Sequence, residues 1–338
     1  MIRLERKTEE TVGLDIGTYS VKIASIKKEA MGNVLSSYNI KRLALSDKTV
    51  KLELLIDEAL KELDLKPANV NLSVSGANVI VRFINLPKMN REQLENALTF
   101  EAEKYIPFDI NEVIMDFLIL GDAPEPGQMR VLLAAARRDL VDSRLKIMEK
   151  LNIPVSLIDI DSFAMFNAFT EANKGLTEEG RALINLGYSQ TNVLISVGEM
   201  PCFMRQIQIG GKDITEAVSK ARTVTFDEAE EMKLRGDEAD REAIKQATFS
   251  VLEDLIREIQ LSFGYFDNRF GKSVSEIYCC GGVLYQAGVT EFLAERTGLQ
   301  VKAWNPAKGM KVAEHLSLED IDILGPQLAV SIGLALRG

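Results

Sequence analysis

The chain contains near its start the stretch Val12-Gly13-Leu14-Asp15-Ile16-Gly17-Thr18-Tyr19-Ser20-Val21-Lys22-Ile23, and a similar stretch follows 170 residues later. The second copy is Ala182-Leu183-Ile184-Asn185-Leu186-Gly187-Tyr188-Ser189-Gln190-Thr191-Asn192-Val193. Each copy has an apolar strand, a small polar residue, a glycine turn rich in hydroxyl groups and a second strand, which is the pattern of a β-hairpin. Two unrelated hairpins with a chance glycine match are the alternative. The repeat favours two similar α/β domains, whose hairpins face each other across a cleft.

The rest of the chain fits around these hairpins. A third strand is expected after each of them, over 37–45 and 200–209, followed by helices over 51–63 and 212–222. Residues 79–154 have the pattern of an inserted helix and sheet, with Asn90 and Gln93 as a capping box. The predicted division is a first core domain of 1–78, 155–180 and 326–338, an insertion of 79–154, a second core domain of 181–212 and 275–325, and a mainly helical part of 213–274.

Composition limits the functions open to this chain. Its 338 residues include 40 Lys or Arg and 50 Asp or Glu, and the net charge of −10 disfavours nucleic acid as a partner. Three cysteines and one histidine, His315, exclude a disulfide framework and any zinc motif with two histidines. The charged N-terminus lacks an apolar signal region, and the apolar stretch 323–336 is shorter than the ~20 residues of a spanning helix. We therefore expect a cytoplasmic protein without a transmembrane segment.

The first hairpin carries the residues best suited to bind phosphate. The motifs G-x-x-x-x-G-K-[ST] and G-x-G-x-x-G are absent from the sequence. The turn after Asp15, however, offers backbone N–H groups and hydroxyls that can surround phosphate oxygens. Lys22 adds a positive charge, and Asp15 can hold a hydrated magnesium ion, which needs few carboxylates.

Three stretches resemble the motifs of the actin-like ATPase superfamily. Residues 13–22 resemble its first phosphate motif, residues 183–192 its second, and Tyr278-Cys279-Cys280-Gly281-Gly282-Val283 its adenosine motif. Within the superfamily the chain is similar to the PilM family of type IV pilus assembly, which has FtsA-like relatives. The stretch Ala102-Glu103-Lys104-Tyr105-Ile106-Pro107-Phe108-Asp109 resembles that family's YIPF…D segment.

The resemblance implies an actin-like fold: duplicated RNase H-like α/β domains, a nucleotide cleft and an inserted α+β subdomain. It implies ATP and Mg²⁺ as ligands, with Asp15 at the metal. For Glu230 and Lys233, placed at the ribose and adenine, an ordinary surface pair is the alternative. The residues that the resemblance places at the nucleotide are Asp15, Gly17, Thr18, Tyr19, Ser20, Lys22, Asn185, Gly187, Gln190, Thr191, Asn192, Gly210, Gly211, Lys212, Glu230, Lys233, Gly281 and Gly282.

Two positions depart from the family pattern and leave catalysis open. Asn185 stands where many actin-like ATPases have a second Asp, and its neutral amide supplies no general base. Tyr19 stands where the family has a small residue. Asp161 is the candidate catalytic residue that would orient water, with Asp159 as its neighbour, and capping of the following helix is the alternative role. The sequence thus predicts ATP binding, with weak or absent hydrolysis.

The resemblance implies a cytoplasmic scaffold, peripheral at the inner membrane, that binds the N-terminal tail of a PilN-type membrane protein. It leaves open whether pilus motor ATPases or further copies of the chain also bind. The alternatives are a small-molecule kinase of the same superfamily and an FtsA-like polymerising division protein. We expect the tail to bind between the first domain and the insertion, where the apolar run 79–87 suggests an exposed strand. Burial of that run in the core of the insertion is the other interpretation.

Overall fold

The structure is a computed structural model, and it describes residues 10–30, 32–43, 51–67, 69–235 and 240–337. The predicted end of the third strand at Leu45 and the predicted start of the long helix at 239 lie outside these residues.

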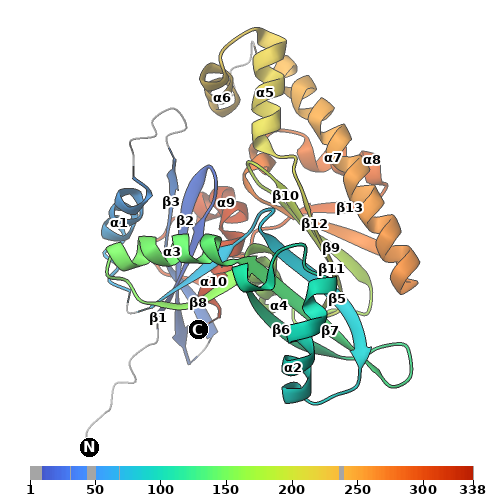
Figure 1. The fold of residues 1–338 in the computed structure, drawn as a ribbon. Helices are drawn as coiled ribbons and strands as arrows, with labels where there is room; N and C mark the ends of the chain where they lie inside the picture. Colours follow the sequence, from blue (N-terminus) through green and yellow to red (C-terminus); the bar gives the residue numbers. More distant parts are fainter. Residues whose placement is uncertain (1–9, 31, 44–50, 68, 236–239, 338) are drawn as a thin grey trace, which may run out of the picture.

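Two β-sheets with the same topology form the body of the molecule (Figure 1). The first has the order β14-β3-β2-β1-β4-β8 and the second the order β11-β10-β9-β12-β13. In both sheets the first three strands along the chain run antiparallel, and the next two run parallel to the first. This agreement in order and direction confirms the predicted duplication. The strands are β1 (Glu10–Ile16), β2 (Ser20–Glu29), β3 (Gly32–Arg42), β4 (Val70–Val74), β8 (Val155–Ile160) and β14 (Lys311–Val312) in the first sheet, and β9 (Gly180–Leu186), β10 (Thr191–Val197), β11 (Met200–Ile207), β12 (Val274–Cys280) and β13 (Gln300–Ala303) in the second.

Helices cover both faces of each sheet. The helices α4 (Asp161–Ala172) and α10 (Ala329–Ala335) lie between the two sheets, where Met165 and Ile332 pack against Ala24 of one sheet and Leu183 of the other. The return of the last helix to the first domain is thereby confirmed. The other face of the first sheet carries α1 (Leu52–Glu62) and α3 (Arg138–Lys150), and that of the second carries α5 (Gly211–Arg222), α7 (Arg241–Phe270) and α8 (Val289–Thr297).

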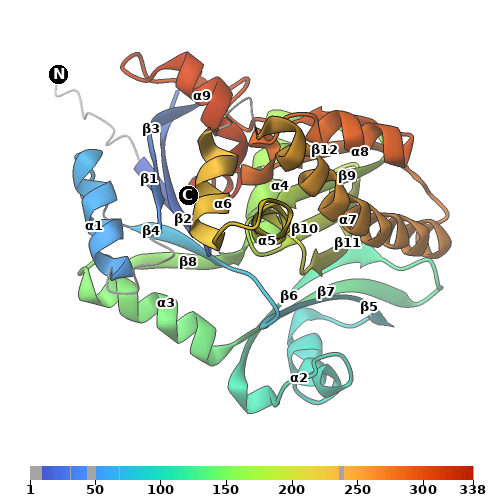
Figure 2. The same cartoon turned by 90° about the horizontal axis from the view of Figure 1, so that it is seen from above.

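The insertion forms a separate three-stranded sheet, at the lower edge of both views (Figures 1 and 2). Its strands β5 (Val79–Pro87), β6 (Val113–Asp122) and β7 (Gln128–Arg137) have the order β5-β7-β6. The helix α2 (Arg91–Glu101) packs on one face and starts with the predicted capping box of Asn90 and Gln93. The helix α3 follows β7 without a break, but Met148 on it packs with α1 against the first sheet.

The strand at 79–87 is an edge strand, as expected, but the expected exposure of its apolar side chains is wrong, and the alternative of burial in the core is confirmed. Val79, Val81, Ile84 and Leu86 are buried in the two cores on either side of the three-stranded sheet. The exposed apolar side chains of the insertion lie instead on its edge strand β6, where Leu118 is 56% exposed. Side chains of a strand point alternately to its two faces. Both faces of β5 are covered, whereas one face of β6 is open to solvent.

None of the described helices combines the length and the apolar character that crossing a bilayer requires. The apolar stretch near the C-terminus is divided among α9 (Leu318–Leu324), one turn of 3₁₀ helix (η4, Gly325–Leu328) and α10.

Candidate functional site

The tips of the two repeated hairpins face each other and touch. The Thr18 hydroxyl donates a hydrogen bond to Ser189 Oγ at 3.0 Å. The rings of Tyr19 and Tyr188 stack with their centroids 4.6 Å apart. Each tip is closed by the same backbone bond, from Gly17 N to Ser20 O and from Gly187 N to Gln190 O, both 3.1 Å long. The repeat therefore produces two turns of one geometry that meet across the cleft.

A small cavity of about 170 Å³ lies at these tips. Among the described residues that line it, four are charged: Asp15, Lys22, Arg144 and Asp161. The Lys22 ammonium donates to Asp15 Oδ2 at 3.0 Å, and both side chains are largely buried. The predicted residues Gly17, Thr18, Tyr19, Ser20, Asn185, Gly187, Gln190, Asn192, Gly281 and Gly282 also line this cavity.

Asp161, and not Asp159, faces this small cavity. Asp161 is the first residue of α4, whose N-cap is Ile160, and no side-chain capping bond is formed there. Burial raises the pKa of Asp161 from 3.8 to about 6, the negative charge of Asp15 adds to this, and the Ser75 and Ser73 hydroxyls oppose it. Asp159 is held by Arg337 at 3.4 Å. Asp161 therefore does not cap α4, and the alternative role is not found in the structure.

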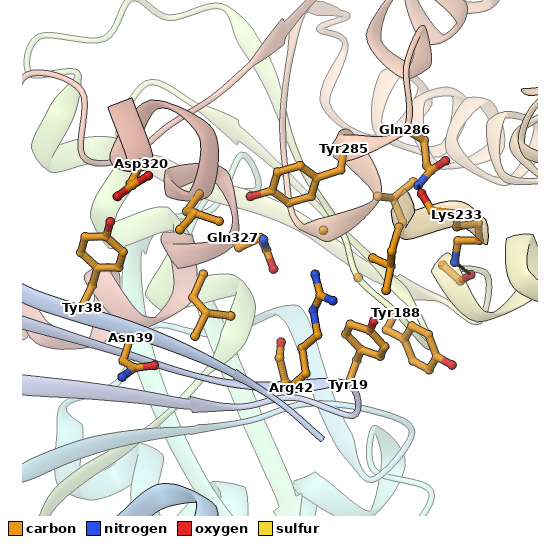
Figure 3. Close-up of a pocket in the computed structure, with 18 of the residues that line it drawn as sticks. Tyr19, Tyr38, Asn39, Arg42, Tyr188, Lys233, Tyr285, Gln286, Asp320 and Gln327 are labelled. Atoms are coloured by element: carbon orange, nitrogen blue, oxygen red, sulfur yellow. Dashed lines mark hydrogen bonds between the residues drawn. The ribbon is translucent and has the colours of Figure 1, made fainter. Parts of the chain in front are cut away.

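A second cavity of about 870 Å³ begins on the other side of the stacked tyrosines (Figure 3). Lys233 of α6 (Phe226–Arg235) lies at one end, and Tyr38 and Asp320 lie at the other. Glu230, which is bonded to Lys233, also lines this cavity. Tyr19 lines both cavities, as do Tyr188, Ser20, Gly187, Gly282 and Gln327. The two cavities are thus neighbouring compartments, and the tyrosine pair stands at their junction.

Glu230 and Lys233 form a buried ion pair at the end of the larger cavity. Lys233 Nζ donates to Glu230 Oε2 at 2.9 Å, to the Gly211 carbonyl at 3.0 Å and to Thr215 Oγ1 at 2.6 Å. The Thr215 hydroxyl in turn donates to Glu230. The side chains of Lys233 and Glu230 are only 6% and 11% exposed, which rules out an ordinary surface pair. Burial lowers the pKa of Lys233, and the charge of Glu230 opposes this effect.

The tyrosines at the junction are kept neutral by their surroundings. Burial, followed by the negative charge of Glu230, raises the pKa of Tyr19 to about 12. The same two causes raise the pKa of Tyr188. Both phenols therefore present an uncharged ring and a hydroxyl group to the cavities at neutral pH.

Three of the predicted residues line neither cavity. Thr191 is buried and donates its hydroxyl to the Ile209 carbonyl at 2.8 Å. Lys212 pairs at 3.5 Å with Glu216 at the surface, and Gly210 packs against the tip of the second hairpin. The first amides of α5 are also occupied, since Gly211 N donates to Gly187 O at 2.9 Å and Lys212 N to Tyr188 O at 2.8 Å. Gly211 itself lines the larger cavity.

Several residues at the cavities were not among the predicted ones. Arg42, at the end of β3, points its guanidinium into the larger cavity between Tyr19 and Tyr285 (Figure 3). Arg144, on α3, lines the small cavity. Neither belongs to a repeated motif, so no pattern in the sequence marks it. Tyr188 lies within the second copy of the repeat and could have been found by its alignment with Thr18, which is one of the predicted residues.

A family model and a solved structure name the same family. The family model described as type IV pilus assembly protein PilM matches residues 13–338. A solved PilM–PilN type IV pilus biogenesis complex contains a chain that is 26% identical, with 98% of each chain covered and a TM-score of 0.86. Two further solved structures show the actin-like fold. The ethanolamine utilization protein EutJ from Carboxydothermus hydrogenoformans is 15% identical over 98% of this chain and 90% of its own, with a TM-score of 0.53. MreB5 of Spiroplasma citri, bound to ADP, is 10% identical over 96% and 95%, with a TM-score of 0.52.

A curated relative shares part of its length with this chain. The cell division protein FtsA of Streptococcus pneumoniae is 24% identical over 278 residues, which are 73% of this chain. The match spans 60% of the length of FtsA, so a large part of that relative lies outside the match.

Proposed function

The chain belongs to the PilM family of type IV pilus assembly proteins, and we propose that it acts there as an ATP-binding scaffold. One observation carries the nucleotide part of the proposal. A small cavity with charged side chains joins a larger cavity of mixed character at the line where two duplicated domains meet. A nucleotide has the same division, because its phosphates are small and charged while its nucleoside is large and partly apolar.

The proposed orientation places the phosphates between the hairpin tips and the adenosine in the larger cavity. Lys22, Thr18 and Ser20 would contact phosphate oxygens, and Glu230 and Lys233 would meet the nucleoside. Because the described residues contain no group of three or more His, Cys, Asp or Glu that could hold a metal, a magnesium ion would be held by Asp15, phosphate oxygens and water. Within residues 213–274, the part that would cover the nucleoside is α6 with the start of α5, which line the larger cavity.

Hydrolysis would be slow or absent in this proposal. Asn185 pairs with Asn192 across the second hairpin, so the second half adds no carboxylate to the small cavity. Asp161 remains to orient a water molecule, and its raised pKa favours the protonated form below about pH 6. Phosphate transfer to a small acceptor would contradict the scaffold and support a kinase.

A melting experiment tests nucleotide binding. At about a hundred times its dissociation constant, a ligand that binds only the folded state adds about 2.7 kcal/mol to the free energy of unfolding. We expect MgATP to raise the melting temperature, EDTA to reduce the shift, and Lys22→Ala to reduce it further. A full shift in Lys22→Ala would contradict the assignment of the phosphate site.

We further propose that the partner is the cytoplasmic tail of a PilN-type membrane protein, which would place this chain at the inner membrane. The similar solved chain comes from a PilM–PilN complex. In this chain the edge strand β6 offers exposed Leu118 and Ile119, which also line a cavity of about 630 Å³ with Met200 and Phe270. Edge strands and apolar pockets suit an extended peptide.

A matched pair of variants tests this surface. Leu118→Glu changes a side chain that is 56% exposed on β6, and Leu54→Glu changes one that is 63% exposed on α1. We expect Leu118→Glu to weaken binding of a PilN-type tail peptide at least tenfold, while Leu54→Glu leaves it unchanged. Equal affinities would place the tail elsewhere. A deletion that spares the first core would have to end before Arg138, since α3 packs on the first sheet.

A further inference from the structure

Arg144 is a cation of the small cavity that no repeated motif includes. It is on α3, and its Nη2 donates to the carbonyl of Ile16 at 3.1 Å. Its Nε is buried and has no hydrogen-bond partner. Among the described residues no carboxylate lies within ion-pair distance of its guanidinium. A buried donor without a partner is unfavourable until a ligand supplies an acceptor.

The other charges of the cavity leave Arg144 as its available cation. Lys22 is already bonded to Asp15 at 3.0 Å. Burial lowers the pKa of the Arg144 guanidinium, and the charges of Asp161 and Asp15 oppose this effect. A guanidinium presents donors in a planar fork, which matches two oxygens of one phosphate group. A guanidinium that lines the cavity, with no described carboxylate paired to it, thus points to an anionic ligand.

The position of Arg144 selects one end of that ligand. It lines the small cavity and is not among the residues that line the larger one. Its bond to Ile16, directly before the Gly17 turn, places it on the first-domain side of the hairpin tips. We propose that Arg144 binds the terminal phosphate of a bound nucleoside triphosphate, and that it makes the site prefer triphosphates to monophosphates. This inference rests on the proposed nucleotide binding.

The contact would also tie the phosphate to the insertion. Six residues before Arg144, at the first position of α3, Arg138 donates to the Val113 carbonyl of β6 at 3.2 Å. One residue earlier, Arg137 N donates to the Asn78 carbonyl at 2.9 Å. A ligand bound to Arg144 therefore contacts a helix whose N-terminal end is hydrogen-bonded to the insertion. Binding of a triphosphate should slow hydrogen exchange along α3.

The experiment measures Mg²⁺-dependent binding of ATP, ADP and AMP by calorimetry. Wild-type protein is compared with Arg144→Gln, Arg144→Lys and a control, Lys146→Gln, at an exposed position of the same helix. Loss of a charge-assisted contact should weaken ATP binding about 10- to 100-fold in Arg144→Gln and change AMP binding less than twofold. Arg144→Lys should recover part of the ATP affinity, and Lys146→Gln should match wild type. Exchange along α3 should slow with ATP in wild type and in Lys146→Gln, but not in Arg144→Gln.

Each other outcome has a defined meaning. Equal loss of ATP and AMP affinity in Arg144→Gln would show that Arg144 only maintains the shape of the cavity. Unchanged ATP affinity would exclude the contact with the terminal phosphate. Either result overturns the inference and leaves the proposed function standing. If wild type binds no nucleotide, the proposed function and the inference fail together. If Arg144→Gln does not fold, Arg144→Lys decides, because an unchanged ratio of ATP to AMP affinity in it would overturn the planar contact.

Discussion

The two hairpins at the cleft have the same backbone and different charges. In the first, Asp15 lies opposite Lys22, and in the second Asn185 lies opposite Asn192, at the same register relative to the turn. Both turns close with the same 3.1 Å bond. The turn therefore has the same backbone geometry with and without the ion pair, and the charges are available for another purpose.

The second half of the molecule carries its buried ion pair away from its hairpin. Glu230 and Lys233 lie on α6, at the end of the larger cavity. The buried ion pair of the first half thus lies at the small cavity, and that of the second half lies at the large one. If this division is correct, removing Asp15 and Lys22 should mainly affect MgATP binding. Breaking the pair of Glu230 and Lys233 should mainly affect stability.

The largest effect is expected from the pair in the second half. Lys233→Met leaves the Glu230 carboxylate buried with Thr215 as its donor, and we expect a loss of about 3 kcal/mol in the free energy of unfolding. Adding Glu230→Gln should recover most of it, because the unpaired charge is then gone. Urea denaturation measures both.

Lys212→Met is the matched control, because Lys212 and Glu216 form an exposed pair on α5. It should cost less than about 1 kcal/mol. A double variant of Glu230 and Lys233 as unstable as Lys233→Met would mean that the packing of Lys233, and not its charge, stabilises α6.

The next effect concerns the shared turn. A Cβ on residue 187 would lie 2.7 Å from Gln190 O, and one on residue 17 would lie 3.0 Å from Ser20 O and 3.3 Å from Lys22 Nζ. The tip at Gly187 is also held by the Gly211 amide, so it has less room to move. We expect Gly187→Ala to lower the unfolding free energy by about 2 kcal/mol and Gly17→Ala by about 1 kcal/mol. Equal losses would show that the second tip is no more rigid than the first.

Local patterns explain which features could be predicted from sequence. The duplicated fold follows from the repeat, and the capping box at Asn90 appears where its spacing placed it. These signals lie within a few residues of one another. Thr191 was misplaced although strand alternation could have corrected it, since neighbouring Asn192 lines the cavity and successive side chains point to opposite faces.

Features that depend on how distant elements pack could not be predicted. Arg144 reaches the cavity from a helix 128 residues after Ile16, the residue it bonds. Arg42 belongs to no motif and enters the large cavity only because β3 ends beside it. The stacking of Tyr19 on Tyr188 depends on how closely the two halves of the molecule approach each other. No single stretch of sequence encodes that distance. Burial of 79–87 likewise depends on α2 covering one face.

Replacing the ion pair of the first hairpin with the two asparagines found in the second should change stability only slightly. It should weaken MgATP binding clearly. Asp15→Asn with Lys22→Asn removes both charges together, so no buried charge is left unpaired and the unfolding free energy should change by less than about 1 kcal/mol. MgATP affinity should fall at least tenfold, about 1.4 kcal/mol. The melting shift with MgATP measures this loss.

The reverse exchange completes the test. Asn185→Asp with Asn192→Lys, added to that double variant, moves the pair to the opposite hairpin. We expect the MgATP affinity to stay low, because Arg144 and Asp161 remain on the first-domain side. Recovery of binding would show that the two hairpins are interchangeable and that the division of charge has no functional meaning.

The smallest effect comes from the remaining carboxylate of the first half. Burial and the charge of Asp15 raise the pKa of Asp161 from 3.8 to about 6, so the folded protein holds this proton more tightly than the unfolded chain does. Its contribution to stability is therefore present below about pH 4 and is lost as the pH rises to about 6. A difference of about two pKa units corresponds to roughly 3 kcal/mol, and the partial exposure of Asp161 at the cavity reduces this to about 1 kcal/mol. Asp161→Asn should thus be more stable than wild type by about 1 kcal/mol at pH 7.5, with a gain that develops between pH 4 and 6 in urea denaturation. A stability gain that is constant from pH 4 to 8 would mean that the amide packs better. It would also mean that the charge of Asp161 does not destabilise the folded protein.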